Sequence, residues 1–113
     1  MSKDYKVYLE DILNAVEKID GYVADMSYED FLADSMASDA VIRNLAIIGE
    51  AAKKLPAHVK KERPEIDWRG IAGLRDIIVH KYSGVNLKVV WDIIKKELPE
   101  LKSEVEEISR SAK

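Results

Sequence analysis

The stretch from Gly73 to Tyr82 places a cation, a carboxylate, an imidazole and a phenol close together in an otherwise apolar segment. Arg75 carries a fixed positive charge on a planar group of donors that suits phosphate. His80 exchanges a proton near neutral pH, and Tyr82 offers a hydroxyl. Asp76 supplies the carboxylate. The combination suits proton transfer next to a phosphate group.

Helical spacing would bring these side chains together in two pairs. At about 100° per residue, Arg75 and Tyr82 return to nearly the same face, while Asp76 and His80 lie one turn apart. The apolar positions beside Arg75 on the same wheel are Ile71, Leu74 and Ile78. We therefore expect the polar groups to border a buried stripe beside a cleft.

Such a set could transfer a phosphoryl group within RNA without a metal ion. His80 could take the proton of a ribose 2′-hydroxyl or give one to the departing 5′-oxygen. Arg75 could stabilise the charge that builds on the phosphate, and Asp76 could orient the imidazole. A single histidine is only half of an acid and base pair. A second copy across a two-fold axis would supply the other half.

The same residues also have a purely structural interpretation. Arg75 and His80 on a helix border would then form an exposed ion pair and cap the helix C-terminus. Tyr82 would be a half-buried core residue with its hydroxyl at the surface. Spacing alone leaves both interpretations open.

The periodicity of apolar residues predicts helices over residues 3–25, 38–55, 68–82 and 87–97, continuing to about 109. Ser27, with an acidic residue three positions later, predicts the start of a short helix, and Asp67 and Asn86 are candidate N-caps. One helical turn is expected around Val59. Pro99 would either kink the last helix or start a new one.

Composition indicates one helical domain covering residues 1–113. The chain is 47% hydrophobic and 35% charged, with five Gly and three Pro. It has no Cys and two His, which excludes disulfides and does not favour zinc. No apolar run could serve as a signal peptide or membrane span, so we expect a cytoplasmic protein. The net charge of −3 predicts that any contact with nucleic acid is local.

Several polar residues lie outside the motif, on the helix predicted over residues 38–55. Arg43, Asn44 and Glu50 fall on a helix whose other face is core. They are solvated or form an ion pair within the bundle, or they support the cleft or contact a partner. Both interpretations are open from sequence.

The second histidine and the two tryptophans receive no chemical role. His58 has no ligand partner at suitable spacing and is expected at the surface. Trp68 and Trp91 fall at helical core positions, where packing is favoured over base stacking. Charged residues 95–97 and 100–107 are expected on the exposed face of the last helices.

These motifs together resemble the HepT family of HEPN-domain proteins. The pattern consists of Arg75-x4-His80-x-Tyr82, the preceding Ile66-Asp67-Trp68-x-x-Ile71-x-Gly73-Leu74, the following Gly84-Val85-Asn86 with Trp91, and the upstream block Arg43-Asn44-Leu45-x-x-Ile48-Gly49-Glu50-Ala51-Ala52. The resemblance covers most of the chain.

The resemblance implies an all-α, up-down bundle of four to five helices that forms a homodimer. It implies a metal-independent endoribonuclease that needs no cofactor and acts as the toxin of a toxin–antitoxin pair. Its catalytic residues would be Arg75 and His80, supported by Asp76. A minimal nucleotidyltransferase would neutralise the toxin by attaching adenosine monophosphate to Tyr82, because a bulky anion there would occupy the phosphate pocket.

A second function is compatible with the same resemblance. The chain could be a non-catalytic helical subunit that binds substrate for a minimal nucleotidyltransferase or regulates it. RNA cleavage by the unmodified protein distinguishes the two functions.

Overall fold

The computed structural model describes residues 5–80 and 86–111, and between residues 75 and 80 it describes the backbone alone. The elements in chain order are α1 (Lys6–Val23), α2 (Tyr28–Ala33), α3 (Ser35–Lys54), α4 (Ala57–Lys61), α5 (Trp68–His80), α6 (Leu87–Asp92), a π-helical segment (Ile93–Glu97) and α7 (Leu98–Ser111). Within these residues helix is the only regular secondary structure. The predicted all-α class is confirmed.

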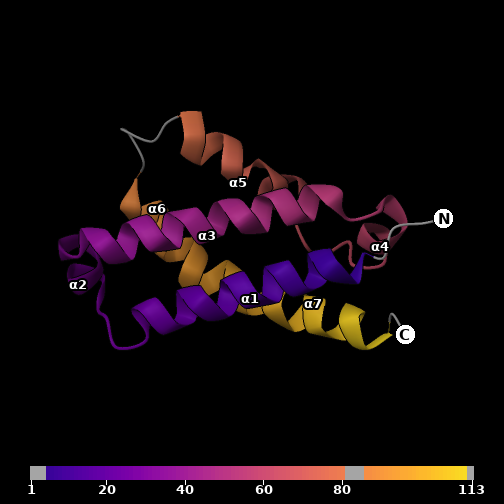
Figure 1. Cartoon of the computed structure of the whole chain (residues 1–113), viewed down its shortest axis with the longest axis horizontal. Coiled ribbons are helices and arrows are strands. Elements are labelled where there is room, and N and C mark those ends of the chain that lie inside the picture. Colours follow the sequence, from indigo (N-terminus) through magenta and orange to yellow (C-terminus); the bar gives the residue numbers. More distant parts are fainter. Residues whose placement is uncertain (1–4, 81–85, 112–113) are drawn as a thin grey trace.

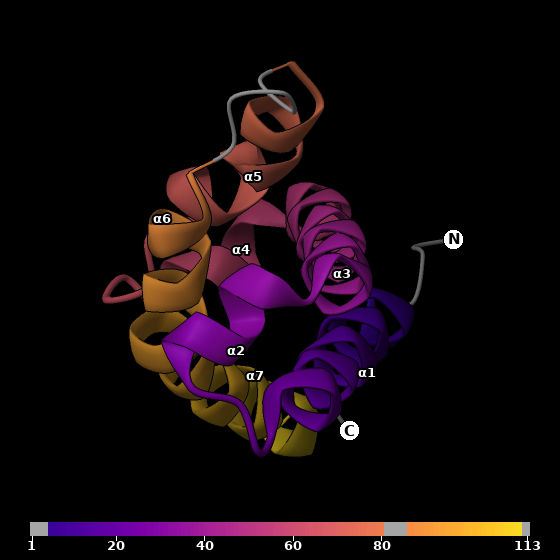
Figure 2. The same cartoon turned by 90° about the vertical axis from the view of Figure 1, so that its left-hand side faces the viewer.

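The long helices run in alternating directions along the long axis of the molecule, which is horizontal in Figure 1. α1 packs antiparallel on one side of α3, and α5 packs antiparallel on the other side. The chain returns through α6 and α7, and α7 packs against α1. Figure 2 shows the same helices end-on, with α5 at the top beyond α3. That residues 1–113 form one domain stays a prediction.

The core follows the apolar stripes that the sequence predicts. Its fully buried side chains include Leu9, Ile12, Val16 and Ile19 of α1, Leu45 and Ile48 of α3, and Leu98, Leu101 and Val105 of α7. Trp68 and Trp91 are partly buried and pack against this core, as expected. Burying apolar surface of this kind contributes about 1.5–3 kcal/mol for each large side chain.

Short polar side chains start most of these helices. Ser27 and Asp30 form the predicted capping box of α2, in which Ser27 Oγ accepts from the Asp30 N–H and Asp30 accepts from the Ser27 N–H, both at 3.1 Å. Asn86 caps α6 through its side-chain oxygen, also as predicted. α3 begins earlier than the sequence suggested. Asp34 Oδ1 accepts from the Ala37 N–H at 3.0 Å and thereby starts the helix at Ser35.

Pro99 neither ends the last helical run nor interrupts its buried stripe. In a regular α-helix, proline has no N–H for the carbonyl four residues earlier and its ring collides with that carbonyl. The segment before it widens into a π-helix, and the Leu98 N–H bonds to the Ile93 carbonyl, five residues back. α7 then begins at Leu98 with Pro99 in its first turn.

The remaining sequence predictions concern the surface and the connection after α3. The helical turn expected around Val59 is α4, and Val59 is buried. His58 is exposed, as expected, although its ring also makes an edge contact with Tyr5 at 5.9 Å between centroids. No helix within the described ranges has the length and apolar character needed to cross a membrane.

Candidate functional site

Helix α5 carries three of the four residues of the predicted motif. Its backbone is helical without interruption from Trp68 to His80, so Arg75, Asp76 and His80 occupy consecutive turns of one element. Their side chains are not described, and Tyr82 lies outside the described residues. The predicted helix is therefore confirmed as far as His80, and the arrangement of the four groups in a cleft stays a prediction.

Contacts at its first turns hold α5 in place. Asp67 Oδ1 accepts from the Gly70 N–H at 3.0 Å, which caps the helix as the sequence predicted. An added Cβ at Gly70 would collide with the Asp67 carboxylate, so a larger residue there would displace that carboxylate from its capping position. Trp68 Nε1 donates to the Arg63 carbonyl at 3.1 Å, and this bond ties the helix start to the preceding connection.

Further along, α5 is anchored by apolar burial. Ile71 is 5% exposed and Leu74 is 8% exposed, and the helix packs on α3. Both residues belong to the apolar stripe that helical spacing predicts beside Arg75. The C-terminal part of α5 extends beyond the other helices at the top of Figure 2. The fold thus holds the motif-bearing end of α5 at an edge of the bundle.

The segment that contains Tyr82 joins two helix ends. α5 is helical to His80, and α6 begins after Asn86, whose side-chain oxygen accepts from the N–H groups of Lys88 at 2.9 Å and Val89 at 3.4 Å. Both ends of this connection are therefore fixed by helical hydrogen bonds. The Gly84 stop predicted within it lies outside the described residues.

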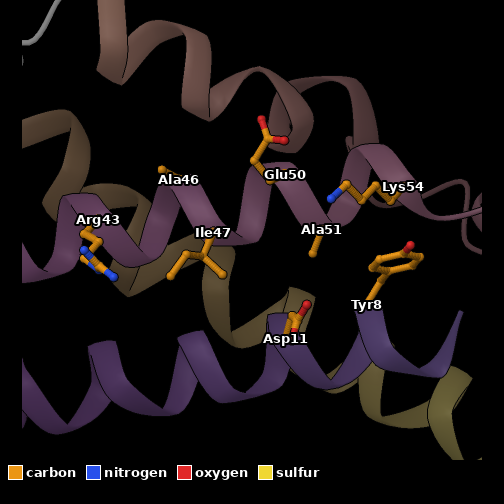
Figure 3. A pocket seen from close by; sticks show the side chains of 8 residues that line it. All are labelled: Tyr8, Asp11, Arg43, Ala46, Ile47, Glu50, Ala51 and Lys54. Carbon is orange, nitrogen blue, oxygen red and sulfur yellow. The ribbon is translucent and has the colours of Figure 1, made fainter.

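The three polar residues of α3 do not share one environment. Asn44 is 4% exposed, and its Nδ2 donates to the Ala40 carbonyl at 2.9 Å. Arg43 and Glu50 line a hollow between α1 and α3. In Figure 3, Arg43 points toward α1 and Glu50 points away from it. The expectation that Asn44 lies on a polar face is wrong, because α3 is covered by helices on two sides.

The hollow between α1 and α3 has a volume of about 320 Å³ and an apolar floor. Its other lining residues are Tyr8, Asp11, Ala46, Ile47, Ala51 and Lys54. Lys54 Nζ lies 5.8 Å from the centre of the Tyr8 ring, a cation–π contact (Figure 3). The sequence alone does not group Tyr8, Asp11 and Lys54, because only the pairing of α1 with α3 brings them together.

A cluster of carboxylates lies beside the start of α5. A side-chain hydrogen bond with Glu65 raises the pKa of Glu104, and burial raises it further. The pKa of Glu65 is lowered, first by a backbone hydrogen bond and then by the same contact with Glu104. Arg63 Nε lies 3.0 Å from Glu104 Oε1, at an angle that pairs the charges without a hydrogen bond.

Among the side chains that the structure describes, those of residues 5–74 and 86–111, no three from His, Asp or Glu gather closely enough to hold a metal ion. In the carboxylate cluster, Glu104 pairs with Arg63 and shares a hydrogen bond with Glu65.

Comparisons with known proteins identify relatives along nearly the whole chain. The model of the "Ribonuclease HepT-like" family matches residues 12–108. "Probable ribonuclease HepT" of Thermococcus cleftensis is 43% identical over 97% of this chain and 100% of its own length. "Putative RNase TTE0752" of Caldanaerobacter subterraneus subsp. tengcongensis is 41% identical over 98% of this chain and 99% of its own length.

One further relative is a longer protein. "Gamma-glutamylcyclotransferase and putative RNase MJ0434" of Methanocaldococcus jannaschii is 43% identical over 93% of this chain. The match spans 47% of that protein, so the chain corresponds to about half of it. No solved structure matches the chain significantly.

Proposed function

Because the chain belongs to the HepT-like ribonuclease family, we propose that it is a metal-independent endoribonuclease that acts in the cytoplasm as a homodimer. The observation that carries the proposal is the family match over residues 12–108, which contains the whole motif from Arg75 to Tyr82. The unbroken helix through Arg75 and His80 supports it, since a regular helix sets the spacing between these groups.

The proposed reaction is an internal phosphoryl transfer. The ribose 2′-oxygen attacks the neighbouring phosphorus, the bond from phosphorus to the 5′-oxygen breaks, and a cyclic phosphate remains on one product. The 2′-hydroxyl proton is removed by one His80 imidazole, and a second imidazole gives a proton to the 5′-oxygen. Arg75 stabilises the charge on the phosphate oxygens, and Asp76 orients His80.

Two histidines at one site require two copies of the chain. One protomer contributes a single motif histidine, and His58 lies on α4, a different element. A two-fold axis beside the C-terminal part of α5 would bring His80 of both copies to one cleft. We therefore place the active site between protomers. Arg43 and Glu50 are candidates for supporting contacts there or for partner binding.

The proposed biological role is that of a toxin held in check by a minimal nucleotidyltransferase. That enzyme would join adenosine monophosphate to the hydroxyl of Tyr82 and release pyrophosphate from ATP. The added phosphate would compete with RNA for Arg75 and fill the space above His80. Intact mass after co-expression with the nucleotidyltransferase tests this role, and an unmodified Tyr82 would contradict it.

Cleavage of RNA in EDTA tests the catalytic proposal directly. We expect the purified protein to cut RNA in excess EDTA and to leave a cyclic phosphate. His80→Ala should lose cleavage by at least about 10²-fold, the usual range for an acid or base, while its far-UV circular dichroism stays helical. Cleavage that survives His80→Ala would remove the mechanism. An intact RNA together with tight nucleotidyltransferase binding would favour the non-catalytic subunit.

A further inference from the structure

A basic hollow lies between α4 and the first turns of α5. Its volume is about 480 Å³, and its lining consists of Ala57, Lys60 and Lys61 of α4 with Trp68, Arg69 and Ala72 of α5. Three of these six residues are cations, and none is acidic. The chain as a whole carries a net charge of −3, so this concentration of positive charge is local.

Two of the three cations are available to a ligand. Lys61 and Arg69 are exposed, and neither has an acidic partner among the side chains that the structure describes. Lys60 is engaged, since its Nζ donates to the Ala52 carbonyl at 3.4 Å near the C-terminus of α3. Lys60 therefore holds α4 in place, while Lys61 and Arg69 are solvated charges at the rim.

A group of carboxylates lies around another side of the start of α5. Arg63 pairs with two glutamates of α7, Glu104 and Glu107. Glu107 Oε1 lies 3.5 Å from Arg63 Nη2. A separate hollow on that side is lined by Glu65, Ile66, Asp67, Ile71, Glu97, Glu100 and Leu101. The start of α5 thus separates an acidic side, turned to α7, from the basic hollow beside α4.

Helix α5 leads from the basic hollow to the motif. Positions 76 and 80 follow position 69 at steps of seven and four residues, so the three positions return to within about 20° of one direction around the axis. Position 80 is displaced from position 69 by about 16 Å along the helix. At 3.4 Å of rise per nucleotide, a strand of roughly five nucleotides covers that distance. Figure 1 shows α5 running from the side of α4 toward α6.

We propose that the hollow between α4 and α5 binds the sugar-phosphate backbone of substrate RNA, several nucleotides away from the phosphate that is cut. The inference rests on the proposed function insofar as RNA is the substrate. Arg69 offers a planar donor fork and Lys61 a compact ammonium, and both bind phosphate oxygens. Contacts to phosphate position the strand without reading its sequence.

The test uses an RNA that binds but cannot be cut. The probe is a fluorescein-labelled oligouridylate with 2′-O-methyl riboses, which lack the attacking hydroxyl, and its Kd is measured by fluorescence anisotropy across salt concentrations. We expect Lys61→Ala/Arg69→Ala to weaken binding on the order of tenfold at about 0.1 M salt. The slope of log K against log salt should fall by about 0.7 for each cation removed.

A matched control removes two cations elsewhere. Lys18 of α1 and Lys96 of the π-helical segment are exposed, and Lys18→Ala/Lys96→Ala should keep the wild-type Kd and slope. Both double variants alter exposed side chains, so their circular dichroism should match the wild type. Lys61→Gln/Arg69→Gln provides a second neutral replacement. With cleavable RNA, the α4–α5 variants should raise KM and leave kcat unchanged.

Several results would overturn the inference, and they differ from those that overturn the function. Wild-type Kd and salt slope in the α4–α5 variants, or no binding of the probe by the wild type, would refute the basic hollow as an RNA site. Loss of nucleotidyltransferase binding with unchanged RNA binding would make it a protein contact. Probe binding that depends on Lys61 and Arg69, with natural RNA left uncut, would keep the hollow and refute the ribonuclease.

Discussion

Tyr82 has a role in the proposed regulation but not in the proposed catalysis. Tyr82→Phe keeps the ring and removes the hydroxyl that would receive the adenylate. We expect the variant to cleave RNA within about threefold of wild type, since general acid–base work falls to His80. It should gain no adenylate mass when co-expressed with the nucleotidyltransferase. Tyr22→Phe alters a 41% exposed tyrosine of α1 and should be modified like the wild type. Adenylation of Tyr82→Phe would place the modification elsewhere.

Phe31 offers a test of how burial is distributed between neighbouring residues. Its side chain is fully buried, and its ring centroid lies 5.1 Å from that of Trp91, whereas Leu32 is 47% exposed. We expect Phe31→Ala to lower the free energy of unfolding by roughly 3–5 kcal/mol, the usual cost of an emptied aromatic site. Leu32→Ala should change it by less than about 0.5 kcal/mol. Urea unfolding measures both, and equal effects would contradict this packing of α2.

Sequence periodicity located the buried residues well and the polar ones less well. Leu45 and Ile48 lie on the apolar period of the helix predicted over residues 38–55, and both are buried. Asn44 was grouped with Arg43 and Glu50, yet it is buried. A helical wheel assumes a single buried face, but α3 contacts α1 on one side and α5 on the other, which widens the buried sector. The sequence does not state which helices are neighbours, so this error could not be seen from one chain.

At the scale of elements, helix starts were more predictable than helix continuity. Ser27, Asp67 and Asn86 cap helices as predicted, because each needs only a short side chain and a free N–H nearby. The path through Pro99 was open from sequence. A break, a kink and a wider turn can each accommodate a proline, which has no N–H to donate. The buried Ile94 and Leu98 decide among them by keeping the stripe on the core.

The connection between α4 and α5 is joined to α7 by carboxylates, and this contact predicts a pH dependence. The raised pKa of Glu104 means that its stabilising contribution is present below its unfolded pKa and is lost as the pH rises through its folded pKa. Glu65, with a lowered pKa, contributes in the opposite direction, above its unfolded pKa. Glu104→Gln keeps a donor toward Glu65 at every pH, and it removes only the pH dependence that comes from Glu104.

We therefore expect Glu104→Gln to gain thermal stability over the wild type as the pH rises from the acidic range toward neutrality, because the wild-type carboxyl ionises there and the amide does not. At acidic pH the two proteins should unfold at nearly the same temperature, because Glu104 is then protonated. Glu106→Gln removes another carboxylate of the same helix and serves as the control. If the difference in unfolding temperature between variant and wild type became smaller as the pH rises, it would contradict the hydrogen bond between Glu104 and Glu65.

For the whole molecule, the proposed active site demands two copies of His80, and mixed dimers test that demand. If each site needs an imidazole from both protomers, a dimer of one His80→Ala chain and one wild-type chain should not cleave RNA. When the two are co-expressed in equal amounts, random pairing leaves about a quarter of the dimers fully wild type. Cleavage should fall to that fraction, whereas independent sites within each protomer would retain half. His58→Ala, at an exposed histidine of α4, should leave cleavage at the wild-type level in the same mixture. Activity that follows the wild-type fraction in direct proportion, with dimers confirmed by sedimentation, would assign the acid and the base to a single chain.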